Sequence, residues 1–171
     1  SPVSHEDLTV ADLGEDALLA MVFPRLPAGA ATVLGPGDDA ALVSAPDGRV
    51  VVSTDVLVEG HHFRREWSTG EDVGWRAAVQ NLADVAAMGA VPVAIVDTVV
   101  GPPETCRAVL DGMRFASLLY DVPVVGGHLT NSADRVALSA FALGRCIGRP
   151  LTATRVAPGQ RLALVVCLEG K

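Results

Sequence analysis

The stretch that decides the fold is residues 35–63, GPGDDAALVSAPDGRVVVSTDVLVEGHHF. Two apolar runs within it, residues 40–45 and 50–58, flank Pro46-Asp47-Gly48, a turn whose glycine suits positive φ. Polar side chains stand at the edges of these runs, and small acidic groups at strand ends are typical of sites for hard cations and phosphates. They comprise three carboxylates, two hydroxyls and a histidine pair: Asp38, Asp39, Asp55, Ser53, Thr54, His61 and His62. The stretch therefore predicts a strand pair that carries a metal-assisted phosphate site.

The remaining sequence alternates helical and strand patterns. Helical spacing of apolar residues predicts helices over 13–23, from Ser68 or Thr69 to Gly89, and over 104–120. Apolar runs predict strands over 91–100, 122–125 and 136–143, while residues 27–32 are expected to form a loop. This order predicts an α+β fold in which a mixed β-sheet has helices packed on one face.

A turn at Pro158-Gly159-Gln160 precedes an apolar run over 161–168. We interpret residues 1–150 as one domain, and residues 151–171 as a linker with the first strand of a second domain. Apolar strands at 50–58 and 91–100 would then need covering, which favours a dimer.

Composition narrows the functional class. Half of the 171 residues are hydrophobic, 19% are charged and the net charge is −7, which predicts a buried core and argues against a broad nucleic-acid-binding surface. An acidic protein that handles an anionic substrate must neutralise it locally, and a bound divalent metal does this. The three cysteines (Cys106, Cys146 and Cys167) lack any CxxC pair and predict reduced thiols in a cytoplasmic protein. The longest apolar runs are too short and too often broken by Gly, Pro or Asp to be expected to cross a membrane.

Each acidic motif also has an interpretation that involves no bound metal. Asp38 and Asp39 in the GDD loop can share magnesium ions, or Asp38 can bond back to its own turn. Asp55 interrupts an apolar strand, where an ionised carboxylate is costly unless it meets a cation or several donors; the alternative is a strand edge that faces water. Asp84 is a further ligand or a helix-surface carboxylate. Taken together, the four acids favour metal binding.

The histidine and glycine motifs are weaker. Adjacent histidines in a strand point in opposite directions, so at most one of His61 and His62 is expected to reach the site. Gly126-Gly127-His128 at the end of a strand is typical of a turn that phosphate can approach. The sequence has no Walker A, GxGxxG, HExxH or GxSxG motif, so a nucleotide would be bound through acid-held metal.

Three segments in register carry a family resemblance: GPGDDAAL (35–42), STDVLVEGHHF (53–63) and EDVGWRAAVQNLADVAAMGA (71–90). Together they resemble thiamine-monophosphate kinase, a member of the aminoimidazole-ribonucleotide-synthetase-like superfamily. The likeness is close over residues 12–90 and looser as far as residue 159. It implies an N-terminal domain that dimerises through its strands and binds ATP with magnesium, and an enzyme that phosphorylates thiamine monophosphate to thiamine diphosphate.

The resemblance also implies roles for individual residues. His62 matches a histidine that contacts the thiamine phosphate, and Arg155 is similar to an arginine that touches ATP, with Gly126 and Gly127 beside the nucleotide. No residue is implied as a nucleophile, because phosphoryl transfer depends on positioning and charge neutralisation. The implied magnesium ligands are Asp39, Ser53, Thr54, Asp55 and Asp84.

One departure from the family leaves alternatives open. The family carries an aspartate ligand where this chain has His128, and histidine suits magnesium poorly. Another superfamily branch, selenophosphate synthetase, has GGH at this place. The alternatives are therefore another ATP-using member with a different acceptor, and a non-catalytic dimerisation or nucleotide-binding module.

Overall fold

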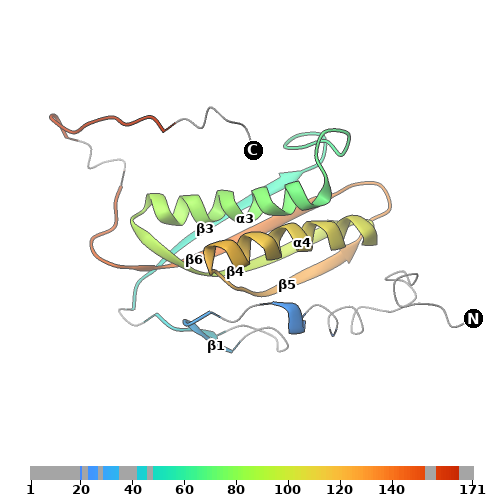
Figure 1. The fold of residues 1–171 in the computed structure, drawn as a ribbon, viewed down its shortest axis with the longest axis horizontal. Coiled ribbons are helices and arrows are strands. Elements are labelled where there is room, and N and C mark those ends of the chain that lie inside the picture. The colour runs from blue at the N-terminus through green and yellow to red at the C-terminus, as the bar shows by residue number, and fades with distance from the viewer. Residues whose placement is uncertain are drawn as a thin grey trace, which may run out of the picture.

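The computed structural model describes residues 20, 23–26, 29–34, 42–45, 48–152 and 157–165. A four-stranded sheet and two long helices make up most of it (Figure 1). The elements are η1 (Phe23–Arg25), β1 (Thr32–Leu34), β2 (Leu42–Val43), β3 (Val50–Val58), α3 (Gly70–Ala87), β4 (Ala90–Gly101), α4 (Pro103–Tyr120), β5 (Val124–Asn131) and β6 (Ala137–Cys146). None of the helices in these ranges is long and apolar enough to span a membrane.

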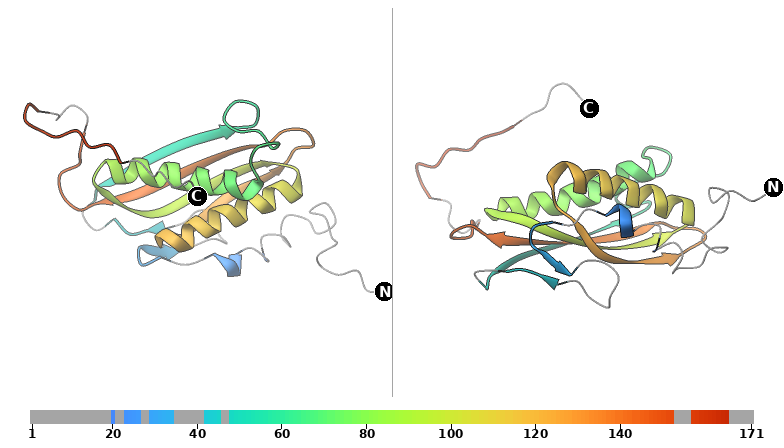
Figure 2. Two further views of the ribbon diagram at one scale, coloured as in Figure 1. Left: turned by 45° about the horizontal axis from the view of Figure 1, so that its top comes forward. Right: turned by 60° about the horizontal axis from the view of Figure 1, so that its bottom comes forward.

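The main sheet has the strand order β3-β6-β4-β5. Strand β6 pairs antiparallel with β3 and β4, whereas β4 and β5 are parallel and are connected through α4. Both helices cover the same face of the sheet, and the right-hand view of Figure 2 shows this helix layer above the sheet. The predicted α+β fold with a mixed sheet and helices on one face is confirmed.

The face covered by the helices holds the core. Odd-numbered β3 residues point toward the helices, and Leu57 is buried there, whereas Val50, Val52 and Val56 are exposed on the opposite face. A cluster of buried residues, among them Ile95, Val99 and Met113, fills the space between sheet and helices. This alternation, expected of a half-covered sheet, gives the sheet one buried face and one open face.

The sequence sets the ends of helix α3. Thr69 is the N-cap: its hydroxyl accepts from the Asp72 amide, and the Asp72 carboxylate accepts in return from the Thr69 amide. The helix ends at Ala87, and Gly89 follows with φ of +69°, which glycine adopts without strain. Thr69 and Gly89 are both boundaries that the sequence predicts.

The predicted hairpin between residues 40–45 and 50–58 is wrong. Strand β2 pairs with β1 in a separate two-stranded sheet, so residue 32, predicted as loop, is in a strand. Strand β3 pairs along its whole length with β6, from Val50 opposite Arg145 to Val58 opposite Ala137. Gly48 does have positive φ, +70°, but the turn leads to a different sheet. Pairing nine residues of β3 with β6 in the main sheet buries far more surface than a hairpin with the two-residue strand β2 could.

Two further predicted strands differ in extent. The run at 122–125 becomes β5, which continues to Asn131, so Gly126-Gly127-His128 lies inside the strand and not in a turn at its end. Residues 161–165 form no strand, and their side chains at Leu162, Leu164 and Val165 are almost fully exposed. The rest of that predicted strand, and most of the predicted 13–23 helix, lie outside the described residues; Ala20 is helical and Phe23 begins η1.

Candidate functional site

Two polar contacts join strand β3 to helix α3. The Ser53 hydroxyl donates to Asp84 Oδ2 at 2.9 Å, and Gln80 Nε2 donates to Asp55 Oδ2 at 2.8 Å. We call these four residues the β3–α3 seam. It brings together two of the predicted carboxylates, which are 29 positions apart in the sequence, and a predicted hydroxyl ligand.

Repeat lengths explain why the seam forms. Residues two apart in a strand share a face and are separated by roughly 6.6 Å, and residues four apart in a helix share a face and are separated by about 6 Å. The spacing of Ser53 and Asp55 therefore equals that of Asp84 and Gln80, so each strand residue contacts one helix residue. The local sequence, STD on the strand and QNLAD on the helix, specifies the seam once the helix lies over the strand.

The donor set of the seam suits a hard cation. It offers carboxylate and hydroxyl oxygens, with Asp84 exposed and Asp55 half-buried, and magnesium takes one or two protein carboxylates together with water and substrate phosphates. Among the residues that the structure describes, no three His, Cys, Asp or Glu side chains come together to form a metal cluster.

Thr54 lies on the opposite face of the sheet. Its hydroxyl donates to the Ala140 carbonyl at 3.0 Å and lies 3.4 Å from Ser139 Oγ. The alternation of a β-strand makes this inevitable, because Thr54 stands between Ser53 and Asp55. Its role as a metal ligand stays a prediction.

His61 and His62 lie in a turn after β3 and not within a strand, so the expected opposite orientation does not apply. Their ring centroids are 6.4 Å apart. His62 Nδ1 accepts from the Val58 amide at 3.0 Å, and the His62 carbonyl accepts from Arg76 Nη1 at 2.6 Å. An Nδ1 that accepts leaves the ring proton on Nε2, so His62 presents a donor on its outward side.

Close packing explains why position 127 holds a glycine. A Cβ at this position would lie 2.1 Å from Asp97 Oδ1 and 2.5 Å from the Asp97 carbonyl, whereas a Cβ at Gly126 would meet nothing within 4 Å. Neither glycine has positive φ. His128, opposite Thr98 on β4, is exposed on the open face. Contact of a nucleotide with Gly126, Gly127 or His128 remains a prediction.

Asp97 is the polar residue that sequence reasoning did not select, although its charge interrupts an apolar strand. It lies under the helices in a row that crosses the sheet from Asp55 through Ala140 to Gly127. Only 5% of it is exposed, and its Oδ2 has no hydrogen-bond partner. Burial raises the pKa of Asp97 to about 7, although a hydrogen bond from its own backbone lowers it.

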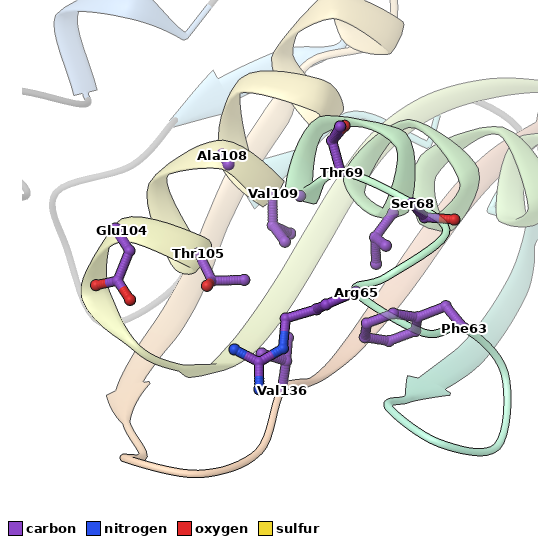
Figure 3. Close-up of a pocket in the computed structure, with 11 residues that line it drawn as sticks. Phe63, Arg65, Ser68, Thr69, Glu104, Thr105, Ala108, Val109 and Val136 are labelled. Atoms are coloured by element: carbon purple, nitrogen blue, oxygen red, sulfur yellow. The ribbon is translucent and has the colours of Figure 1, made fainter.

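A cavity of about 230 Å³ opens where α3 and α4 begin, between the helices and the loop that follows β3 (Figure 3). Arg65 lines it and donates to Glu59 Oε1 at 2.6 Å, and this hydrogen bond lowers the pKa of Glu59. Phe63, Val109 and Val136 supply apolar walls. None of the candidate residues within the described ranges lines this cavity, so it is separate from the seam.

Three of the candidate residues fall outside the described ranges: Asp38, Asp39 and Arg155. Their places in the site remain predictions. Cys106 and Cys146 are free thiols, in agreement with the predicted reduced state of these two residues. Burial, with the nearby Glu104 as a smaller cause, raises the pKa of Cys106 to about 11, which makes this thiol unreactive.

Comparison with known proteins agrees with the fold. Residues 37–146 match the family model described as AIR synthase related protein, N-terminal domain. The chain is 43% identical over 168 residues to thiamine-monophosphate kinase of Mycobacterium tuberculosis, covering 95% of this chain and 50% of that protein. The chain therefore spans about half the length of the curated relatives it matches.

Solved structures show the same likeness. Thiamine-monophosphate kinase from Stenotrophomonas maltophilia superposes with a TM-score of 0.66 and 33% identity, covering 81% of this chain and 45% of that one. A structure described as AaThiL complexed with AMPPCP and TMP has a TM-score of 0.51 and 24% identity, covering 82% of this chain and 44% of that one. At that identity the second likeness supports the fold alone. With its four-stranded sheet, its two covering helices and these matches, the chain belongs to the AIR synthase related family and is a homologue of the N-terminal region of thiamine-monophosphate kinase.

Proposed function

We propose that this chain is the nucleotide- and magnesium-binding part of a cytoplasmic ATP phosphotransferase resembling thiamine-monophosphate kinase. The observation that carries the proposal is the β3–α3 seam, in which Asp55 and Asp84 are brought to one edge of the sheet by Gln80 and Ser53. Relatives named for that activity match nearly the whole chain. The activity of the whole enzyme is part of the proposal.

In this proposal Asp55 and Asp84 hold magnesium, and Ser53 and Gln80 orient the two carboxylates through their hydrogen bonds. Asp39 is proposed as a further ligand, with Arg155, Gly126 and Gly127 on the nucleotide, whereas the hydroxyl of Thr54 lies on the opposite face of the sheet and is not part of this set. The bound metal would neutralise phosphate charge during transfer. His62, with its proton on Nε2, would donate to the phosphate of the acceptor. None of these residues acts as a nucleophile.

Replacing Asp55 with asparagine tests the metal site. Asp55→Asn keeps the shape and the contact with Gln80 but removes one anionic ligand, so we expect magnesium-dependent affinity for a non-hydrolysable ATP analogue to fall roughly tenfold or more. Isothermal titration with and without magnesium measures it. Asp111→Asn, an exposed position on α4, is the matched control and should bind like the parent chain. An absence of magnesium-dependent binding in both this chain and its full-length form would remove the proposal.

His128 favours a second candidate, an ATP-using relative with a different acceptor. Its exposed side chain lies on β5 beside Thr98, where the resemblance implies an aspartate. A screen of phosphate acceptors with the full-length form, followed by ADP release, separates the two candidates: turnover with thiamine monophosphate alone excludes the second. For a non-catalytic module, neither the parent nor His128→Asp would turn over any acceptor.

We also propose that a second copy of the chain covers the open face of the sheet. Val52 and Val56 are each 51% exposed and Phe141 is 37% exposed on that face, on the side that the helices leave uncovered (Figure 2). Such apolar exposure on a broad flat sheet is typical of an interface. The proposed dimer rests on this surface and on the resemblance.

A charge on the open face should break this dimer. We expect the parent chain to sediment as a dimer at micromolar concentration and Val56→Asp as a monomer, because the carboxylate would lie desolvated between two apolar sheets. Ile147→Asp, exposed beyond the end of β6, is the control that should remain dimeric. A monomeric parent chain in analytical ultracentrifugation would contradict the proposal.

A further inference from the structure

The open face of the sheet carries almost no charge, although the chain has a net charge of −7. The four strands contain three charged side chains: Asp55 and Asp97 lie on the helix side, and only Arg145 lies on the open side. Two copies of an acidic chain repel each other, so they meet with least repulsion through a face that lacks acids. The distribution of charge therefore favours a second copy as the occupant of this face.

The size of the open face is that of a small dimer interface. Four strands spaced about 4.8 Å apart, with the nine residues of β3 rising about 3.3 Å each, give a face of roughly 600 Å². Two copies would bury roughly 1,200 Å² in total, at the lower end of the range for specific complexes. The Thr54 hydroxyl on this face already donates to the Ala140 carbonyl at 3.0 Å, so its burial leaves no donor unpaired. Such an interface has enough area to form, but too little to offset a buried charge.

His128 is the side chain of this face that changes charge near neutral pH. It is exposed on β5, opposite Thr98 of β4, and the same row continues across the sheet through Ser139 of β6 to Val56 of β3. Histidine is the side chain whose ordinary titration falls between pH 5 and 8, and the four strands contain no second histidine. Covering the open face with a second copy therefore removes from water a group that can take up a proton.

Among the described residues, the surroundings of His128 offer no net negative charge to balance that proton. Its neighbours on the open face, Gly126 and Thr130 of β5 and Thr98 of β4, are uncharged. Asp97 lies on the other side of the sheet, and burial raises its pKa to about 7, so it is neutral in acid. The other charged side chains around the sheet stand at its two ends, two arginines at one end and two acids with two arginines at the other: Arg49 and Arg145, then Glu59, Asp134, Arg65 and Arg135.

We propose that His128 makes the dimer sensitive to pH: the neutral imidazole is buried between the two sheets, and its protonation separates the copies. The inference rests on the dimer proposed above, and it adds a role for the residue at which the chain departs from the family pattern. An imidazolium keeps its hydration only in the monomer, so the monomer binds protons more tightly than the dimer and acid favours the monomer. One dimer contains two copies of His128, so its separation takes up two protons.

Sedimentation equilibrium of the parent chain at about pH 8 and about pH 5.5 tests this coupling. Because two protons accompany dissociation, we expect the dissociation constant of the dimer to be on the order of 100-fold higher at the lower pH. His128→Gln keeps a neutral polar side chain, so its dissociation constant should change by less than about threefold. His61→Gln is the matched control: His61 lies in the turn after β3, outside the sheet, and its loss should leave the pH dependence of the parent intact.

His128→Lys gives the converse test, because lysine is charged at both pH values and this variant should be monomeric at both. A parent chain that is monomeric at pH 8 removes the proposed dimer and this inference with it. A parent dimer with the same dissociation constant at both pH values overturns the inference alone. So does pH dependence that persists in His128→Gln, or a His128→Lys chain that dimerises like the parent. Far-UV circular dichroism separates dissociation from unfolding, and loss of the helical signal together with the dimer also overturns it.

Discussion

Asp97→Asn should stabilise the protein at neutral pH and reduce the pH dependence of its stability. In the fold, burial raises the pKa of Asp97 from its ordinary value of 3.8 to about 7. Below pH 4 the carboxyl is protonated in both folded and unfolded chains. Between about pH 4 and pH 7 the unfolded chain loses the proton while the folded chain keeps it, so stability falls as pH rises. Above pH 7 the full penalty is present.

The size of this effect follows from the shift. A difference of about three pKa units corresponds to a free energy of unfolding on the order of 4 kcal/mol. Asparagine has nearly the same shape and cannot ionise, so Asp97→Asn removes that penalty. We expect the gain in melting temperature to be largest at pH 7–8 and to vanish near pH 4.

Thermal unfolding from pH 4 to pH 8 measures this prediction. Asp111→Asn, exposed on α4, makes the same chemical change in solvent and should leave the pH profile within about 0.5 kcal/mol of the parent. A profile for Asp97→Asn that runs parallel to the parent at every pH would show that Asp97 is not the group that titrates.

Gly74→Ala should destabilise the protein strongly, even though alanine is the better helix former. Helices α3 and α4 lie side by side (Figure 1) and touch through their backbones. A Cβ at Gly74 would lie 1.8 Å from the Val109 carbonyl oxygen, and one at Gly112 would lie 2.0 Å from the Glu71 carbonyl oxygen. Neither obstacle is a flexible side chain, so the helices themselves would have to separate.

Separating the helices opens the core beneath them, which includes Val109 and Met113. The cost exceeds the roughly 1 kcal/mol that alanine gains over glycine in a helix, and we expect a net loss of roughly 2–4 kcal/mol. That loss lowers the melting temperature by roughly 5–15 °C.

Gly148→Ala is the control for the glycine prediction. Its Cβ would meet nothing within 4 Å, and its φ is not positive, so its melting temperature should stay near that of the parent. Chemical denaturation gives the free energies for both variants. Equal stability of Gly74→Ala and Gly148→Ala would mean that the two helices are not in backbone contact.

Helix boundaries and fold class were predictable because they depend on neighbours in the sequence. Thr69 caps α3 with Asp72 three residues later, and Gly89 takes the left-handed conformation just past the end. The two candidate carboxylates of the seam, Asp55 and Asp84, were also predictable, since charged groups at the edges of apolar runs stand out. Their partners were not, because Gln80 and Ser53 meet them only when α3 lies across β3.

Strand pairing was less predictable. The turn at Gly48 suggested that β2 and β3 form a hairpin, yet β3 pairs with β6, whose residues are more than 75 positions away. A turn motif specifies a change of direction, whereas the partner strand is chosen by the total surface that pairing buries. Asp97 was visible as a charge within a strand, but the absence of a partner for its Oδ2 depends on α3 and α4 above it.

By itself, the sequence determined the fold class, the two long helices with the ends of α3, and which acids are available for a metal site. These properties follow from side-chain period and local hydrogen bonding, which act over a few residues. Only the tertiary structure decided that Ser53 and Asp55 face α3 while Thr54 faces away, that Gly127 is packed by Asp97, and that the helices touch at Gly74. Those outcomes depend on contacts between distant segments, where close packing selects one arrangement among many that the local pattern allows.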